Sequence, residues 1–290
     1  MTATLIMQLR DAGRLAVDDP LEQHLPGTGL GALTLRQLLS HASGMQREPE
    51  GDWWERTAGV DLTTLLAGLT ADKIAYPPHH TYHYSNLAYG LLGGMLERLG
   101  GKPWTDLLDE RILTPLGLGR TTYAATEPYA RGYVVHPGTT RCARNPYRHR
   151  RDGPGRATLV DHRGPGSLGR LPRRPRPVGA GRRDTDRDVL PVVISDREAW
   201  THGHGLGLEL FREGNRVYVG HGGSMPGYGA SLAVHRPSRT AVVGLVNAYT
   251  LRVCTSAPSD GNCSPWSWTP NPRRSPLAAA AARRPPNWPS

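Results

Sequence analysis

The sequence has no long apolar stretch, few cysteines and no visible export signal. No apolar run reaches the roughly eighteen residues that a membrane-spanning helix needs. The three cysteines, Cys142, Cys254 and Cys263, argue against a disulfide framework in a chain of 290 residues. The first ten residues, MTATLIMQLR, lack the basic region and the small-residue cleavage site of a signal peptide. The sequence leaves the location open. As it stands, it predicts a cytoplasmic chain without a membrane span.

The positive charge of the chain is concentrated in two stretches. The formal net charge is +10, but residues 141–188 hold fourteen Arg against five Asp, and residues 252–290 hold five Arg against one Asp. The rest of the chain is mildly acidic, and all three cysteines fall within these two stretches. The average composition of the whole chain therefore describes neither the two basic stretches nor the mildly acidic remainder. We expect no nucleic-acid partner, because the longer basic stretch, residues 141–188, is almost without aromatic side chains to stack on bases.

The two Arg/Gly/Pro-rich stretches have three interpretations. Their composition is typical of a disordered linker, and a basic nucleic-acid arm is the second possibility. The third is out-of-frame translation of a G/C-rich gene. A shifted frame around Trp266 and Trp268 can give VVLDAEP, which resembles the end of an apolar helix. We favour the frameshift interpretation, and we expect residues 138–190 and 252–290 to be aberrant or disordered segments.

The remaining chain divides into a helical part, residues 1–137, and a strand-rich part, residues 191–251. Apolar residues recur at helical spacing in four segments: 1–12, 34–41, 86–99 and 104–113. After residue 203 the pattern predicts four strands: 205–211, 216–220, 229–235 and 240–247. Turn residues at 212–215 and 236–239 predict hairpins between successive strands. Helices followed by an antiparallel meander predict an α+β fold, in which a helical subdomain packs on a reduced antiparallel sheet.

Three motifs occur in a fixed order along these two parts. The first is TLRQLLSHASGM at residues 34–45, the second is Tyr84-Ser85-Asn86, and the third is HGGSMPGY at residues 221–228. Together they resemble the serine β-lactamase and penicillin-binding-protein-like hydrolases, which include class C β-lactamases, D-Ala-D-Ala carboxypeptidases and related esterases. The resemblance covers residues 1–137 and 191–251, and it implies an incomplete β-lactamase-like fold.

The resemblance implies roles for the second and third motifs. Acyl transfer by a serine needs a base within hydrogen-bond reach and donors aimed at the developing oxyanion. By position, Tyr84 would be the catalytic residue that relays a proton to and from the nucleophile, and Asn86 would donate to the substrate. His221, Gly222 and Gly223 would line the substrate, and Ser224 would supply an oxyanion N–H from its backbone. The resemblance implies a small-molecule or peptide substrate, no cofactor and no metal, and leaves the oligomeric state open.

Each motif also has a purely structural explanation. A Tyr before a helix is usually packing, with the following Ser85 as the N-cap. Isolated histidines such as His41 and His221 are more often structural than functional. The pairs His202–His204 and His79–His80 lack a third ligand at zinc spacing. Only the co-occurrence of the three motifs favours the functional interpretation.

The nucleophile of this family is absent from the sequence. The family carries Ser-x-x-Lys at the start of a helix that continues into Thr-Ala and an apolar stripe, as residues 2–9 do here. No Ser-x-x-Lys occurs, and neither Lys73 nor Lys102 has a serine three residues before it. We therefore expect an inactive fragment of a hydrolase for β-lactams, D-Ala peptides or esters. Its missing upstream strands would leave an unpaired sheet edge. The alternative is a non-catalytic ligand-binding protein that retains the cleft.

Overall fold

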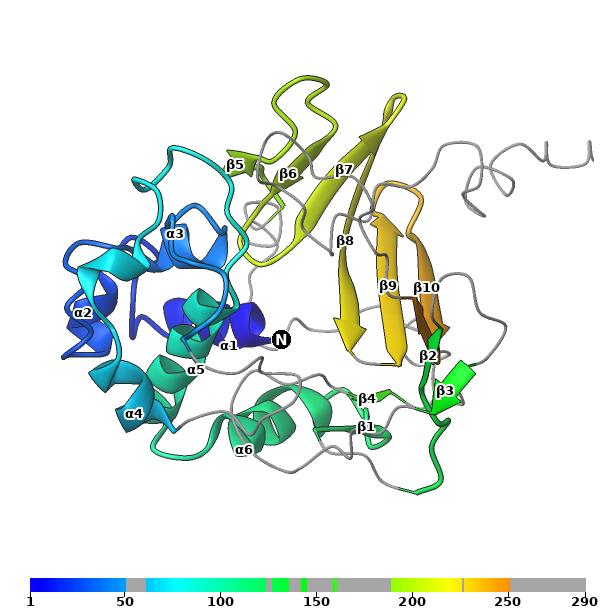
Figure 1. Cartoon of the computed structure of the whole chain (residues 1–290), viewed down its shortest axis with the longest axis horizontal. Coiled ribbons are helices and arrows are strands. Elements are labelled where there is room, and N and C mark those ends of the chain that lie inside the picture. The colour runs from blue at the N-terminus through cyan, green and yellow to red at the C-terminus, as the bar shows by residue number, and fades with distance from the viewer. Residues whose placement is uncertain are drawn as a thin grey trace, which may run out of the picture.

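The computed structural model describes residues 1–50, 61–123, 127–135, 142–144, 159–160, 189–225 and 227–250 (Figure 1). A helical part lies beside a six-stranded antiparallel sheet, which confirms the predicted α+β fold. Most of the segment 138–190 and all of the tail 252–290 lie outside the described residues. The frameshift and disorder interpretations of those stretches therefore stay predictions.

The helical part is built from short helices around one long central helix. Its elements are α1 (Thr2–Asp11), α2 (Leu21–His24), α3 (Leu35–Leu39), α4 (Leu62–Ala67), η1 (Ala71–Lys73), α5 (Asn86–Gly100), α6 (Trp104–Leu108) and the single π turn η2 (Asp109–Leu113). Helix α5 packs against α1, α3 and α6. Its apolar stripe supplies the fully buried Leu91, Leu92 and Met95, which join a core made mostly of leucine.

Local sequence signals fix where these helices begin and end. Thr34 and Gln37 form a capping box at the start of α3, in which each side chain accepts from the other's backbone N–H. Gly13 follows α1 with a φ of +68°, and its N–H donates to the carbonyl of Arg10. Gly101 ends α5 in the same left-handed conformation. The bounds of α1 and α5 are thus close to those that the sequence predicts, residues 1–12 and 86–99.

The sheet is an antiparallel meander that runs in chain order. Its strands are β5 (Val193–Ile194), β6 (His202–His204), β7 (Glu209–Glu213), β8 (Arg216–Met225), β9 (Tyr228–His235) and β10 (Thr240–Val246). Both predicted hairpins are confirmed, at Glu213↔Arg216 and at His235↔Thr240. Two small additional sheets pair β1 (Thr121–Thr122) with β4 (Leu159–Val160), and β2 (Tyr133–Val135) with β3 (Cys142–Arg144) and β11 (Ala248–Thr250).

Two strand boundaries differ from the prediction, and each has a physical reason. The strand expected from residue 205 begins only at Glu209, because Gly207 has a φ of +90° and turns against α1. A Cβ on Gly207 would lie 2.4 Å from the Cβ of Ala3. Strand β8 continues past residue 220 to Met225, because the glycines of the third motif pair in register with β9. Residues 221–225 of the third motif are therefore part of β8.

Strand β10 forms one edge of the sheet. Its large apolar side chains, Val242, Val243, Leu245 and Val246, are 40–58% exposed. Within the described residues its ladder partner is β9 alone. A near-continuous apolar run is typical of a strand covered on both faces, so this strand is more open than its sequence suggests.

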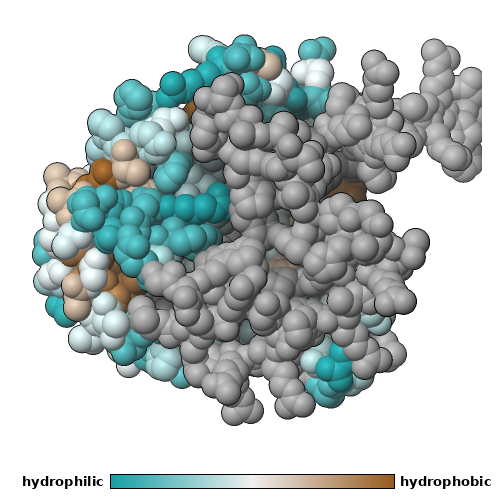
Figure 2. All heavy atoms as spheres, in the orientation of Figure 1, coloured by the Kyte–Doolittle hydropathy of each residue, from teal (hydrophilic) through white to brown (hydrophobic). Residues whose placement is uncertain are grey.

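The visible surface of the described residues is mixed in character. Figure 2 shows hydrophilic residues over much of it, with small hydrophobic patches over the helical part. Of the helices in the described ranges, none has the length and apolarity to cross a membrane.

Candidate functional site

Tyr84 lies immediately before α5, next to the cap of that helix. The hydroxyl of Ser85 accepts from the N–H of Ala88 at 3.0 Å and donates to the carbonyl of Gln46 at 2.7 Å. Ser85 is fully buried. Because its hydroxyl has both a donor and an acceptor within the fold, the structure favours the capping explanation for this serine. The capped helix start fixes the backbone on either side of Ser85, and so the position from which the Tyr84 ring projects.

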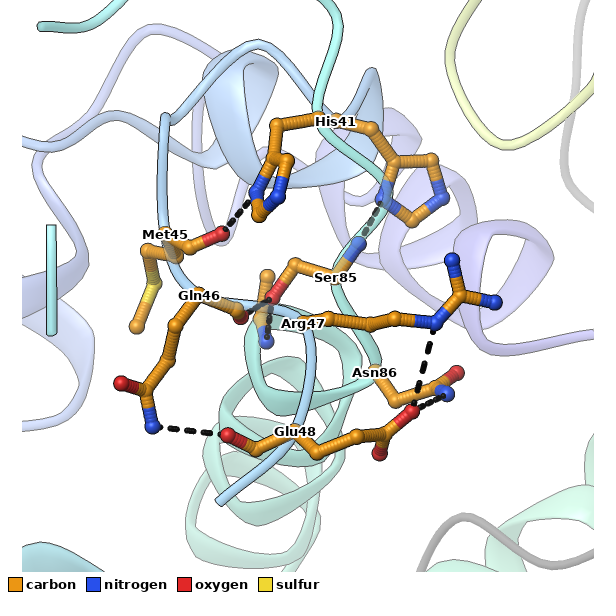
Figure 3. Close-up of polar contacts among 9 residues, drawn as sticks. His41, Met45, Gln46, Arg47, Glu48, Ser85 and Asn86 are labelled. Atoms are coloured by element: carbon orange, nitrogen blue, oxygen red, sulfur yellow. Dashed lines mark hydrogen bonds and ion pairs between the residues drawn. The ribbon is translucent and has the colours of Figure 1, made fainter. Parts of the chain in front are cut away.

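The ring of Tyr84 stacks on buried His41. The two ring centroids lie 4.2 Å apart, with an angle of 29° between the planes. His41 has a φ of +57°, and its Nδ1 accepts from the N–H of Ser85 at 3.1 Å (Figure 3). The proton of the neutral ring therefore sits on Nε2. Burial, with a smaller contribution from His204 and His221, holds the pKa of His41 well below its ordinary value, so the ring is neutral at physiological pH.

Arg47 places a positive charge beside Tyr84. Its guanidinium carbon lies 5.1 Å from the centroid of the Tyr84 ring. Burial raises the pKa of the Tyr84 phenol, and the guanidinium of Arg47 acts in the opposite direction. The two lysines, Lys73 and Lys102, form ion pairs with surface carboxylates. In the described part of the chain, the cation next to Tyr84 is thus an arginine.

The side chain of Asn86 binds an acidic residue of the chain itself. Its Nδ2 donates to Oε1 of Glu48 at 2.7 Å, and Nε of Arg47 lies 3.6 Å from the same oxygen (Figure 3). The backbone N–H of Asn86 donates to the carbonyl of Arg47 at 2.8 Å, which ties the start of α5 to the segment that carries Arg47 and Glu48. The amide that the sequence predicts to hold a substrate is therefore occupied by Glu48.

The third motif brings His221 to Tyr84 from the sheet. The ring centroids of Tyr84 and His221 lie 6.2 Å apart. His204 on β6 lies 6.3 Å from His221 and 4.8 Å from His41, centroid to centroid. Ser224 lies three residues further along β8, and its hydroxyl donates to a carbonyl of β9. Segments that flank α3 and α5 and strands of the sheet therefore contribute rings to one cluster around Tyr84. The chemical roles of these residues stay predictions.

His204 is fully buried, and one of its nitrogens has no partner in the described part of the chain. Its Nδ1 donates to the carbonyl of Gly205 at 2.9 Å, so Nε2 of the neutral ring is an acceptor. No donor reaches that Nε2 among the residues described. Burial lowers the pKa of His204 to about 4, although the bond to Gly205 acts to raise it. The ring is therefore neutral at physiological pH.

The two glycines of the third motif leave space beside β8. A Cβ on Gly222 would meet nothing within 4 Å, and a Cβ on Gly223 would lie 3.9 Å from the Cβ of Ala230. A Cβ on the preceding Gly220 would lie 1.9 Å from the carbonyl oxygen of Leu232. The fold therefore requires glycine at position 220, but it does not require glycine at position 222 or 223.

Three residues of the site escaped prediction from the sequence: Arg47, Glu48 and His204. Arg47 and Glu48 lie two and three residues after the first motif, and nothing in their type or spacing indicates a contact with Asn86, which is 38 residues beyond Glu48. The sequence pattern around His204 suggested only a zinc pair that lacks a third ligand. Across the described ranges, no group of three His, Cys, Asp or Glu side chains is placed to hold a metal ion.

Comparison with known proteins gives matches in both sequence and structure. The model of the family described as Beta-lactamase matches residues 1–253. The chain is 33% identical over 146 residues to the D-alanyl-D-alanine-carboxypeptidase/endopeptidase AmpH of Escherichia coli (strain K12), a match that covers 47% of the chain and 37% of that protein. It is 38% identical over 125 residues to penicillin-binding protein 4 of Amycolatopsis lactamdurans, covering 40% and 32%. The matches thus span about a third of these curated relatives.

Solved structures show the same fold. A penicillin binding protein from Bacillus halodurans superposes with a TM-score of 0.69 at 22% identity, covering 85% of this chain and 78% of that one. A D-stereospecific amidohydrolase from Streptomyces sp. gives a TM-score of 0.67 at 24% identity, covering 85% and 79%. Identities this low establish the architecture and carry no information on substrates.

Proposed function

The chain belongs to the beta-lactamase family of serine hydrolases, and we propose that residues 1–290 form the substrate-binding part of an acyl-transfer site without supplying its nucleophile. One observation carries the proposal: Tyr84, stacked on His41 and next to Arg47, lies 6.2 Å from His221 of the sheet, centroid to centroid. The proposed substrates are β-lactams, D-Ala-terminated peptides or esters. The name of one relative, a D-alanyl-D-alanine-carboxypeptidase/endopeptidase, supports D-configured peptides among them.

In this proposal Tyr84 exchanges a proton with a serine supplied from outside these residues. To accept that proton, the phenol must first lose its own, and burial opposes this by raising the pKa of Tyr84. The nearby guanidinium of Arg47 stabilises the phenolate and so favours the exchange. His41 fixes the plane of the phenol and, being neutral, leaves Arg47 as the cation that stabilises the phenolate.

The remaining groups hold the substrate. The amide of Asn86 donates to a carbonyl or carboxylate of the substrate. The space beside Gly222 and Gly223 lets the substrate lie close to strand β8. The backbone N–H of Ser224 is proposed as one donor to the oxyanion, where such donors contribute most to catalysis.

Residues 1–290 are proposed not to turn substrate over by themselves. No Ser-x-x-Lys occurs in them, and the hydroxyl of Ser85 is engaged by Ala88 and Gln46. Loss of the nucleophile lowers the rate by about a million-fold in a well-studied serine protease. The residual binding groups orient a substrate without forming an acyl-enzyme.

A labelling experiment tests the proposal. We expect fluorescent penicillin and a chromogenic cephalosporin to raise the melting temperature of the purified polypeptide without labelling or hydrolysis. A polypeptide extended upstream to include Ser-x-x-Lys should gain labelling, and a Ser→Ala change in that motif should abolish it. Labelling of residues 1–290 that disappears in Ser85→Ala contradicts the proposal. Stabilisation by ligand in an extended polypeptide that stays unlabelled supports a non-catalytic ligand-binding protein instead.

A further inference from the structure

A carboxylate of the chain lies where two hydrogen-bond donors of the site meet. Oε1 of Glu48 accepts from Nδ2 of Asn86 at 2.7 Å and lies 3.6 Å from Nε of Arg47 (Figure 3). The two donors come from different segments, one at the start of α5 and one after the first motif. Their convergence on a single oxygen is a geometry suited to binding an anion.

Hydrogen bonds fix the backbone around this contact, whereas the ion pair between Arg47 and Glu48 is long. The carbonyl of Arg47 accepts from the N–H groups of Asn86 and Leu87 at 2.8 and 3.2 Å, and the carbonyl of Glu48 accepts from the side chain of Gln46 at 2.7 Å. The Arg47–Glu48 pair is longer than a hydrogen bond, and it engages Nε rather than the terminal nitrogens of the guanidinium. The donors are therefore held in place, while the pair between Arg47 and Glu48 is too long for a hydrogen bond.

Both charged side chains reach solvent. The side chain of Arg47 is 32% exposed and that of Glu48 is 28% exposed. Partly exposed ion pairs of this kind contribute little to stability. A ligand carboxylate can therefore replace Glu48 without disturbing the hydrophobic core, to which neither Arg47 nor Glu48 belongs.

We infer that Arg47 and the amide of Asn86 form a subsite for a substrate carboxylate, and that Glu48 occupies this subsite in the ligand-free chain. The inference rests on the proposed function, because it takes Asn86 to face bound substrate. It adds a substrate class: acyl D-amino acids and peptides with a free carboxylate are preferred over their neutral amides. The planar guanidinium presents two parallel donors to such a carboxylate, which Glu48 does not use.

The charges of the site exclude the opposite preference, for an ammonium group. Glu48 is already balanced by Arg47, and its Oε1 is already an acceptor for Asn86. When Glu48 is displaced, the site presents the guanidinium of Arg47 and the amide of Asn86. Both groups donate hydrogen bonds, so they bind a carboxylate rather than an ammonium group. Arg47 also lies 5.1 Å from the Tyr84 ring, so a bound carboxylate is placed next to the proposed reacting group.

Fluorine NMR titration of the full chain with N-trifluoroacetyl-D-alanine and N-trifluoroacetyl-D-alaninamide tests the inference. Removal of the competing charge in Glu48→Gln should strengthen binding of the acid by about twofold to fivefold, the upper part of the range for a partly exposed ion pair. Binding of the amide should change by less than about twofold, since it gains no charge interaction. Arg47→Gln should lower the affinity for the acid to that for the amide. Glu110→Gln and Arg36→Gln, which break surface ion pairs elsewhere, serve as matched controls.

The two ligands separate failure of this inference from failure of the proposed function. If the amide binds in an Asn86-dependent manner but Glu48→Gln leaves the acid unchanged, the carboxylate subsite is wrong and the proposed function stands. An equal gain for acid and amide in Glu48→Gln also overturns the subsite. If neither ligand binds to the wild-type chain or to Glu48→Gln, both ideas fail. Thermal melting of each variant establishes that it is folded.

Discussion

The imidazole of His41 lies against the phenol of Tyr84, with ring centroids 4.2 Å apart and planes inclined by 29°. The same imidazole accepts a hydrogen bond from the N–H of Ser85, so one buried side chain fixes both the ring and the backbone of the second motif. His41 belongs to the first motif, which thereby acts as the support of the second. This pairing explains why the two motifs occur together in one chain.

Replacement of His41 by Leu should lower the free energy of unfolding by about 1–3 kcal/mol, because the buried N–H of Ser85 loses its acceptor. The left-handed φ of His41 adds strain to most replacements. His41→Asn is the matched control, since asparagine tolerates this conformation and its carbonyl oxygen can accept from Ser85. Urea denaturation measures both. An equal loss in the two variants would show that the hydrogen bond contributes nothing.

The stability of the chain should fall as the pH drops from about 6.5 towards 4. Burial lowers the pKa of His204 to about 4, whereas the unfolded chain binds the proton near the ordinary value of 6.5. In this window the unfolded state is the more protonated one, so acid favours unfolding, by about 3 kcal/mol in total for His204. His41, whose pKa is also lowered, steepens the same slope.

Urea denaturation across the pH range measures this effect. His204→Asn should flatten the slope between pH 6.5 and 4, because the group that differs between folded and unfolded states is removed. The exposed His80, changed to Asn, serves as control. Carboxylates with lowered pKa, such as Asp19, act below about pH 4 and fall outside the window. An unchanged slope in His204→Asn would exclude this residue as the origin.

Gly222→Ala should leave stability almost unchanged and weaken ligand binding. A Cβ at position 222 meets nothing within 4 Å, so its effect appears only when a molecule lies beside β8. Gly220→Ala is the contrasting variant: its Cβ would lie 1.9 Å from the carbonyl oxygen of Leu232, and we expect a loss of about 2 kcal/mol or more. Thermal melting with and without fluorescent penicillin separates the two effects. Full ligand affinity in Gly222→Ala would place the ligand away from this strand.

Ser85→Ala should destabilise the chain by about 1 kcal/mol or more, because the hydroxyl caps α5 and also donates to the carbonyl of Gln46. Ser85→Thr keeps the hydroxyl and should lose less stability. Neither change should alter the background reaction with a fluorophosphonate probe, since the serine is proposed as a cap. Reduced probe labelling in Ser85→Ala but not in Ser85→Thr would reveal a chemical role.

The sequence predicts those parts of the fold that depend on local signals. The helical spacing of residues 1–12 and 86–99 and the turn residues of the two hairpins are all visible in the sequence. The start of β7 is not, because it is set by the contact of Gly207 with α1, a segment some two hundred residues away in the chain. Local periodicity cannot report such a contact.

The same distinction applies to the site. The motif residues Tyr84 and His221 are recognisable from the sequence, and the structure places their rings together. The partner of Asn86 was not recognisable, because Glu48 is an ordinary acidic residue whose importance comes only from where the chain folds back. The buried lone pair of His204 likewise exists only after β6 has packed against the helices.

The open edge at β10 has a practical consequence for any preparation of this polypeptide. Among the described residues one row of backbone donors and acceptors on this apolar strand has no ladder partner, and such an edge is a template for the strands of neighbouring molecules. Intermolecular pairing depends on protein concentration, whereas the internal stability of the fold does not. The yield of folded protein should therefore depend on protein concentration and on the rate of refolding. Rapid refolding at low concentration should recover more protein than a change of buffer that only stabilises the helical core.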